Sequence, residues 1–287
     1  MSAVSNRDKL VFALPAAAFT MLVLAFPFIY TIILSVQEFD ITGTAFFSGA
    51  SNYIRLAQDP EFWNSVRVSA IIYFACLILQ LVAGTYMGML LFHSQFMGGV
   101  LRSILISPFV LPPVVVGMMF LVIFDPSLGA ANYLLEMMGL PKALWLASPE
   151  MVIPTIVLLD TWQWTPFVAL IVLGGLQSVP QSVYEAAAVD GASRSTIFFR
   201  ITLPMLGPTI MTAAILRSVD LLRFFDIIYI TTGGGPGNAS NAMNIYAYRI
   251  GFEYFDLGYA AALMLTLTAL VLGVVFVLNK VRSAVTW

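Results

Sequence analysis

The chain has 287 residues, of which 60% are hydrophobic and only 10% are charged, and its mean hydropathy is +0.92. Because a soluble domain carries about a quarter charged residues, this composition excludes an ordinary soluble protein and indicates one embedded in a bilayer. The net charge is -2 and no run of lysine or arginine occurs, so nucleic acid is not expected as a partner.

Six apolar stretches are long enough to cross about 30 Å of hydrocarbon as helices. Apart from two arginines inside the fifth stretch, an inside N-terminus would place seven Lys and Arg residues inside and four outside. Cationic loops resist translocation, so both termini are predicted to be cytoplasmic. We therefore expect an all-α membrane protein, with 1–287 as a single transmembrane domain in contact with lipid. The stretches cover about 10–36, 66–92, 103–124, 151–176, 205–230 and 259–279.

The second stretch contains the residues most often used in metal and redox chemistry. Cys76 is the single cysteine, so no intrachain disulfide is possible, and its apolar surroundings favour a buried side chain. The single histidine, His93, lies at the inner end of the stretch without a Cys/His cluster. We therefore predict no catalytic residue and no metal ligand. Gly84 and Gly88 form a GxxxG pattern, which predicts close helix packing.

Prolines lie within or at the ends of the third and fourth stretches. Proline removes a helical hydrogen bond, and a membrane tolerates this only where the freed backbone is covered or lines a cavity. We therefore expect bent helices around a path. The prolines concerned are Pro108, Pro112, Pro113, Pro154 and Pro166.

The fourth stretch carries a polar and aromatic cluster, made of Asp160, Trp162, Gln163 and Trp164. Aromatic rings can stack on a sugar-like solute, and the carboxylate and amide can hydrogen-bond it. An aromatic belt at the membrane surface is an equally good interpretation. Both interpretations stay open on the sequence.

Residues 177–204 connect the fourth and fifth stretches on the predicted cytoplasmic side, and their sequence predicts two short helices. Pro180 suits the first turn of the first helix because no amide donor is needed there. Ser178 or Ser182 can cap its N-terminus. The charges and the break by glycine show that this segment is not a membrane span.

The first of these helices should end at Asp190, because Gly191 can adopt the left-handed conformation that commonly terminates a helix. A second helix is expected from about 193 to 203. The alanines at 186–188 make the first helix thin enough to enter a groove on another protein, with Glu185 and Asp190 able to pair at the rim. A solvated connector is the alternative interpretation.

The fifth stretch places four alternating charges three residues apart: Arg217, Asp220, Arg223 and Asp226. Each charge near the bilayer centre costs about 2.5–3.5 kcal/mol, whereas each large apolar residue returns only about 0.3–0.6 kcal/mol. The row should therefore face protein or a water-filled path. Either structural pairing or the lining of a solute path explains it, and buried acid–base residues also suit an ion-coupled secondary transporter.

The pattern Glu185-Ala186-Ala187, three residues, Gly191, nine residues, Ile201, one residue and Leu203-Pro204 matches the EAA signature of inner-membrane permeases of binding-protein-dependent ABC importers. Residues 52–63 and 225–238 also resemble carbohydrate-type permeases. The chain is thus similar to the carbohydrate uptake group, which includes maltose and glycerol-phosphate importers.

This resemblance implies a six-helix type I importer permease in the bacterial inner (plasma) membrane. Its partners would be a second, related permease, two copies of a cytoplasmic ATPase and an extracytoplasmic solute-binding protein. ATP and Mg would bind the ATPase, leaving this chain without a cofactor or bond chemistry. The expected ATPase-docking residues are Glu185, Ala186, Ala187, Asp190 and Gly191, and the expected substrate-path residues are Asp160, Trp162, Gln163, Arg217, Asp220, Arg223 and Asp226.

Overall fold

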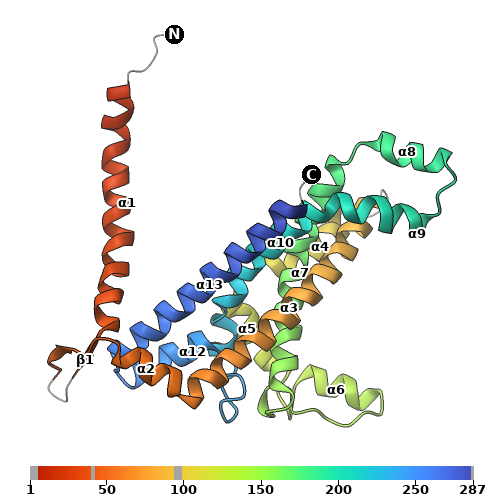
Figure 1. The fold of residues 1–287 in the computed structure, drawn as a ribbon. Coiled ribbons are helices and arrows are strands. Elements are labelled where there is room, and N and C mark those ends of the chain that lie inside the picture. Colours follow the sequence, from red (N-terminus) through yellow and green to blue (C-terminus); the bar gives the residue numbers. More distant parts are fainter. Residues whose placement is uncertain (1–5, 40–42, 94–98, 286–287) are drawn as a thin grey trace. The chain divides into compact units, whose positions relative to one another are not determined.

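The computed structural model describes residues 6–39, 43–93 and 99–285, and most of them are helical (Figure 1). The chain forms two compact units that alternate along the sequence. The first contains Met1–Phe62 and Ala247–Thr268, and the second contains Trp63–Tyr246 and Ala269–Trp287.

The first unit combines one long apolar helix with a short hairpin. Strands β1 and β2 are antiparallel, with Glu38 opposite Phe46. Asn52 is buried and donates from Nδ2 to the carbonyl oxygens of Ser35 (3.0 Å) and Gln37 (2.8 Å), which joins α2 to the end of α1. The elements are α1 (Asn6–Ser35), β1 (Gln37–Phe39), β2 (Ala45–Phe47), α2 (Ser51–Gln58), a π-helical turn (Arg249–Glu253) and the start of α13 (Leu257–Val285).

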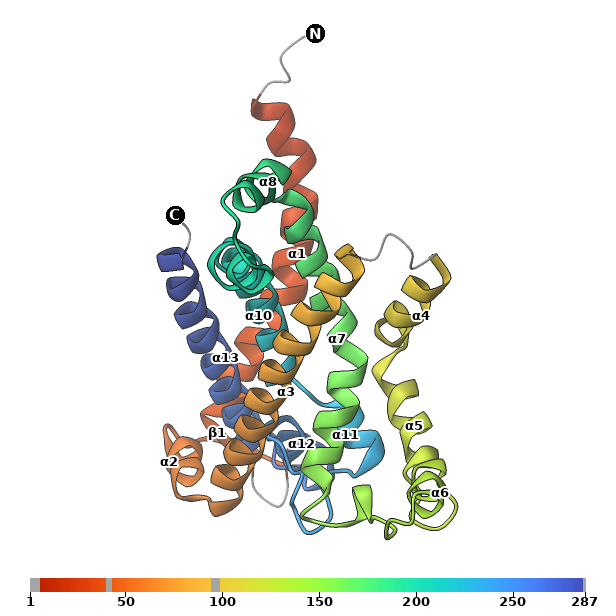
Figure 2. The same ribbon diagram turned by 90° about the vertical axis from the view of Figure 1, so that its right-hand side faces the viewer.

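The second unit contains most of the remaining helices and the end of α13, whereas the first residues of α3 and the last two of α12 fall in the first unit. The long helix α7 of the second unit packs against α10 and α4, and α11 packs against α5 (Figure 2). Its elements are α3 (from Pro60 to His93), α4 (Gly99–Val110), α5 (Pro113–Ile123), α6 (Ala130–Met137), a 3-10 turn (Trp145–Ala147), α7 (Val152–Ser178), α8 (Gln181–Val189), α9 (Arg194–Ile197), a π-helical turn (Phe198–Thr202), α10 (Leu203–Leu222), α11 (Asp226–Thr231) and α12 (Met243–Tyr248).

Five of the described helices are long and apolar enough to cross a membrane, or six spans if a bent pair counts as one. The bent pair is α4 and α5, which turn by 104° at the break between them. The predicted span over 103–124 is therefore bent, as its prolines predicted. Pro112 and Pro113 cannot donate backbone hydrogen bonds, and a proline pushes the preceding residue out of the helical region, so the helix ends before this pair.

The fifth predicted span lies within the candidate span Arg194–Thr231, but its helix is interrupted. Helix α10 ends at Leu222, Arg223 has a non-helical backbone, and α11 starts at Asp226. Residue Phe224, which lies in the break, packs against two buried hydrophobic clusters. This packing accompanies the turn of the chain between the two helices.

The contact between α3 and α7 confirms the close packing predicted from the GxxxG pattern. A Cβ added at Gly84 would lie 2.5 Å from Cβ of Val168, and one added at Gly88 would lie 2.9 Å from the carbonyl oxygen of Ala169. Larger residues at these positions would push the helices apart. Cys76, on the same helix α3, is free and buried in the hydrophobic core, as predicted.

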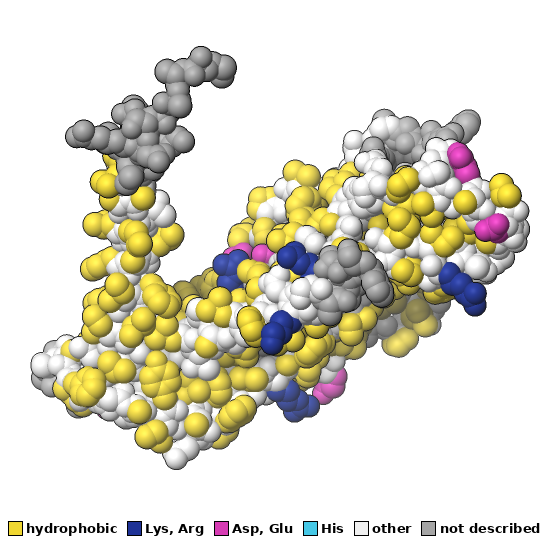
Figure 3. All heavy atoms as spheres, turned by 45° about the horizontal axis from the view of Figure 1, so that its top comes forward, with side chains coloured by type: hydrophobic (Ala, Val, Ile, Leu, Met, Phe, Trp, Pro, Cys, Tyr) yellow, Lys and Arg dark blue, Asp and Glu magenta, His cyan; other side chains and the backbone are white. Residues whose placement is uncertain are grey.

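Short helices of the second unit lie beyond the two ends of α7. Figures 1 and 2 show α8 and α9 at one end of α7 and α6 at the other. On the face shown in Figure 3, hydrophobic side chains cover most of the surface and charged side chains are few and scattered. Such a surface fits a protein whose flanks contact lipid.

Candidate functional site

A buried polar cluster joins α3, α7 and α10. The guanidinium of Arg217 donates from Nη2 to Oδ2 of Asp160 (2.9 Å) and from Nε to Oε1 of Gln80 (2.8 Å). Nε2 of Gln80 donates to the same Oδ2 of Asp160 at 2.6 Å. The ring of Trp164 lies beneath Arg217, with 4.2 Å between Cζ and the ring centroid.

Burial of this cluster is nearly complete, since the side chains of Arg217 and Asp160 are 1% and 0% exposed. An isolated charge there would be very costly, so each charge depends on the other and on Gln80. The cation–π contact with Trp164 adds stabilisation to the guanidinium. The cluster therefore fixes the relative positions of three helices.

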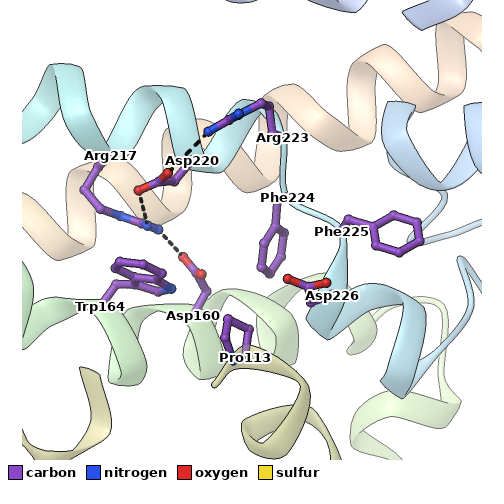
Figure 4. Close-up of a pocket in the computed structure, with 9 residues that line it drawn as sticks. All are labelled: Pro113, Asp160, Trp164, Arg217, Asp220, Arg223, Phe224, Phe225 and Asp226. Carbon is purple, nitrogen blue, oxygen red and sulfur yellow. Dashed lines mark hydrogen bonds and ion pairs between the residues drawn. The ribbon is translucent and has the colours of Figure 1, made fainter. Parts of the chain in front are cut away.

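A cavity of about 370 Å³ opens beside this cluster (Figure 4). Its charged lining residues are Asp160, Arg217, Asp220, Arg223 and Asp226, and its other lining residues are Pro113, Trp164, Phe224 and Phe225. Pro113 follows the break between α4 and α5, and Phe224 lies in the break between α10 and α11. The cavity thus forms where two spans are interrupted, as expected for irregular backbone at membrane depth.

The charges predicted as one row occupy different settings. Asp220 lies between two arginines, 3.6 Å from Nη1 of Arg217 and 3.8 Å from Nη2 of Arg223. Asp220 and Arg223 are 41% and 63% exposed, unlike Arg217. Asp226 begins α11 and is exposed. Arg217, Asp220 and Arg223 lie at the end of α10. The break after Leu222 separates Asp226 from them.

Two predicted path residues lie outside the cavity lining. Gln163 is buried and donates from Nε2 to the carbonyl oxygen of Leu111 (2.8 Å), at the break before Pro112. It thus supplies a donor at a break where the two prolines have none to offer. Trp162 packs edge-on against Phe120 of α5, with 5.3 Å between ring centroids.

Gln80 is the cluster member that the sequence analysis missed. A signal was present, because an amide inside an apolar stretch needs a hydrogen-bonding partner. Its position on α3, 137 residues before Arg217 in the sequence, gave no indication of which partner it has.

The α8–α9 segment has the predicted stop signal. Gly191 has a φ of +69°, its N–H donates to the carbonyl oxygen of Ala188 (3.1 Å), and the N–H of Ala192 donates to that of Ala187 (3.0 Å). This pair of bonds is the Schellman motif, which satisfies the last carbonyls of a helix. The prediction of a left-handed glycine after Asp190 is confirmed.

Two details of this segment differ from the prediction. Pro180 itself occupies the N-cap position of α8 without a side-chain cap, so the proposed cap by Ser178 or Ser182 was wrong. The second helix continues into α10 through a π-helical turn, in which the N–H of Leu203 donates to the carbonyl oxygen of Phe198. Pro204 lacks an N–H, and the wider turn fits the missing helical hydrogen bond at this point.

The docking residues expected on α8 are mostly open to solvent. Glu185, Ala186, Asp190 and Gly191 are exposed, and Ala187 alone is buried. Within the described residues, Glu185 and Asp190 form no ion pair. Their carboxylates are therefore available to a partner.

Metal-binding groups can be checked only in the part of the chain that the structure describes. There, no group of three or more His, Cys, Asp or Glu side chains is arranged to hold a metal ion. His93 ends α3, and its side chain lies outside the described residues.

Several relatives align over most of the chain. A probable ABC transporter permease, y4oQ from Sinorhizobium fredii, is 35% identical and covers 92% of this chain and 86% of that protein. The trehalose/maltose transport system permease protein MalF from Thermococcus litoralis is 37% identical, with coverages of 82% and 79%. The sulfoquinovosyl glycerol transport system permease protein SmoG from Agrobacterium fabrum is 34% identical, with coverages of 89% and 84%.

Solved structures show the same fold. A bacterial alginate ABC transporter, crystallised with an alginate pentasaccharide-bound periplasmic protein, contains a chain that matches with a TM-score of 0.84 at 23% identity, covering 96% of this chain and 94% of that one. A chain of the inward-facing methionine transporter MetNI matches with a TM-score of 0.59 at 18% identity, with coverages of 80% and 99%.

The family comparison covers the part of the chain that contains the cavity and the α8–α9 segment. The family described as "Binding-protein-dependent transport system inner membrane component" matches residues 80–281. None of the relatives named above is described as an ion-coupled carrier, so the comparisons favour the ABC permease interpretation. The chain belongs to this family of multi-pass membrane proteins and is a permease subunit of an ABC importer.

Proposed function

We propose that the importer carries a sugar or sugar-derived solute across the inner membrane of a bacterium. The observation that carries this proposal is the polar cavity at the breaks of two spans, which combines carboxylates with aromatic rings. Carboxylates accept hydrogen bonds from sugar hydroxyl groups, and rings cover the apolar faces of a sugar. The names of the trehalose/maltose and sulfoquinovosyl glycerol permeases support the same class of solute.

The chain works with partners. We infer a second, related permease subunit, two copies of a cytoplasmic ATPase and an extracytoplasmic solute-binding protein. The periplasmic protein in the alginate transporter complex supports the last of these. ATP and Mg bind the ATPase subunits in this scheme, and this chain performs no bond chemistry and needs no cofactor.

Helix α8 is the proposed contact with the ATPase. Its exposed Glu185 and Asp190 offer carboxylates at the rim of the contact, Ala186 and Ala187 keep the helix thin, and Gly191 turns the chain back. The segment 177–204 is then a cytoplasmic coupling loop of a single transmembrane domain. The Schellman motif holds the last turn of α8 in place, so a movement of the ATPase is passed to the rest of the loop without unwinding the helix.

The movement follows from this contact. ATP binding closes the ATPase pair, the docked α8 moves with it, and the permeases pivot from inward-open to outward-open. Hydrolysis restores the first state. The ATPase biases a two-state permease in the way any ligand does, through its different affinity for the two states.

The predicted path residues take different roles in this proposal. Asp220, Arg223 and Asp226 line the cavity with exposed groups and contact the solute. Asp160 and Arg217 pair at the cavity wall and hold it in position. Gln163 and Trp162 support the break between α4 and α5 and the packing of α5.

The test uses the importer reconstituted in vesicles with its partner subunits. Glu185→Lys should abolish most solute uptake and its coupling to ATP hydrolysis while leaving the amount of folded protein unchanged. Glu136→Lys is the charge-reversal control, because Glu136 is an exposed glutamate on α6 at the other end of α7. Glu136 pairs with Lys142 at 3.1 Å, so the control also loses one surface ion pair. Normal uptake in Glu185→Lys would refute the docking role of α8.

A further inference from the structure

The charged side chains around the cavity are not balanced. Arg217 is matched by Asp160 at 2.9 Å, and Arg223 is matched by Asp220 at 3.8 Å. In the described part of the chain, Asp226 has no ion-pair partner, and Figure 4 draws no interaction to its carboxylate. The cavity therefore has one carboxylate more than it has guanidinium groups.

The two guanidinium groups differ in how far a solute can reach them. Arg217 is 1% exposed, and its Nη2 and Nε donate to Asp160 and Gln80. Arg223 is exposed, but its Nε donates to the carbonyl oxygen of Val219 (3.2 Å) and its Nη2 lies near Asp220. A solute entering the cavity therefore meets one exposed guanidinium, that of Arg223, together with the carboxylates of Asp220 and Asp226.

Asp226 is the carboxylate that the lining leaves unpaired. It is the first residue of α11, it is exposed, and it faces the cavity. A negative potential therefore remains in the cavity.

We propose that this cavity disfavours anionic solutes and takes an uncharged, polyhydroxylated solute. Hydroxyl groups donate to the carboxylates of Asp220 and Asp226, and the aromatic lining covers the apolar faces of the sugar ring. The inference rests on the proposed import of a sugar-type solute and adds its charge class. An unpaired carboxylate several ångströms from a bound anion, in a partly polar site, reduces its occupancy by about tenfold.

The charge of the cavity can be measured without transport. The full-length chain is placed in lipid nanodiscs with Cys76→Ala to remove the native thiol and Pro113→Cys to add one in the cavity lining. Cationic, neutral and anionic methanethiosulfonate reagents are then compared by their rates of modification. The same reagents applied to Leu128→Cys, at a position 92% exposed on the loop before α6, give their ratio in open solvent. This reference also carries Asp125→Asn, because Oδ1 of Asp125 accepts from the N–H of Leu128 (2.8 Å) and its charge would otherwise bias the ratio.

The ratio of cationic to anionic modification should be about tenfold higher at Pro113→Cys than at Leu128→Cys, with the neutral reagent between them. Adding Asp226→Asn should bring the ratio close to that of Leu128→Cys, and adding Arg223→Gln should increase it. Phe224→Cys gives a second thiol in the same cavity if Pro113→Cys does not yield folded protein.

Equal ratios at the two positions would overturn the inference, as would an unchanged ratio in Asp226→Asn. The assay keeps this inference separate from the proposed function. An importer that carries sugars but shows equal ratios would contradict only the charge class, whereas a chain with the expected ratios and no sugar import would contradict the proposed function.

Discussion

The buried cluster at Asp160 and the α8 segment use the same kinds of side chain in opposite ways. In the cluster, Arg217 and Asp160 are almost fully buried and bond to each other and to Gln80. On α8, Glu185 and Asp190 are exposed, and the described residues provide them with no ionic partner. A charge whose partners lie in the same chain stabilises the fold, whereas a charge left open is free to bind another subunit.

This difference gives two distinct expectations for substitutions. Changes in the cluster should reduce the amount of folded protein, because they leave a buried charge without its partner. Changes on the surface of α8 should leave the fold intact and act on coupling.

The largest effect is expected from Arg217→Met, which leaves the buried carboxylate of Asp160 without its cation. The cost should be about 3–5 kcal/mol, as for other buried pairs that lose one partner. Thermal unfolding of the purified chain in detergent measures it. The double variant Arg217→Met with Asp160→Leu should recover most of the loss, because no unpaired charge remains. If the double variant is no more stable than Arg217→Met, the pair is not the source of the loss.

Gly191→Ala tests the α8 side of the comparison. At a φ of +69° a side chain other than glycine costs about 1–2 kcal/mol, although no neighbouring atom would clash with the added Cβ. The strain is confined to an exposed segment, so global unfolding should change little. Solute uptake per unit of ATP hydrolysed should fall in reconstituted vesicles. The matched control is Gly139→Ala, another left-handed glycine with open space around it, next to α6; an equal loss of coupling there would argue against a special role for Gly191.

Asp220→Leu lies between the two extremes, because Asp220 contacts buried Arg217 but is itself 41% exposed. Removing it should cost about 1 kcal/mol of stability, since Arg217 keeps Asp160 and Gln80 as partners. Uptake should fall more than the amount of folded protein does, because the carboxylate lines the cavity. Parallel losses of uptake and folded protein would assign Asp220 to structural pairing alone.

The same two regions show which features could be predicted from the sequence and which could not. The end of α8 at Gly191 depends on residues within one turn, so local signals were sufficient to predict it. The pairing of Asp160 with Arg217 depends on how α7 packs against α10, and no local signal in the sequence specifies that packing.

The breaks in the spans were predictable only in part. The prolines at 112 and 113 predicted a bend, and the structure places a 104° turn there. The break after Leu222 has no proline or glycine, so its position follows from tertiary packing around Phe224. The sequence analysis placed all four charges on one helix, but α10 ends at Leu222, before Asp226.

The smallest expected effect concerns Ser193, which caps α9. Its Oγ accepts a hydrogen bond from the N–H of Thr196 at 3.2 Å, and both residues belong to the exposed segment. Ser193→Ala should cost about 0.5–1 kcal/mol. Because α9 continues into the π-helical turn and α10, only its first turn should open more often, and the amide of Thr196 should exchange about two- to fivefold faster. The same substitution at a serine that caps no helix, Ser182→Ala on α8, should change exchange little, since Pro180 is the N-cap of that helix. A docked ATPase that orders the segment would reduce the difference between Ser193→Ala and the unsubstituted chain, whereas a difference that persists in the assembled importer would show that α9 does not share the interface of α8.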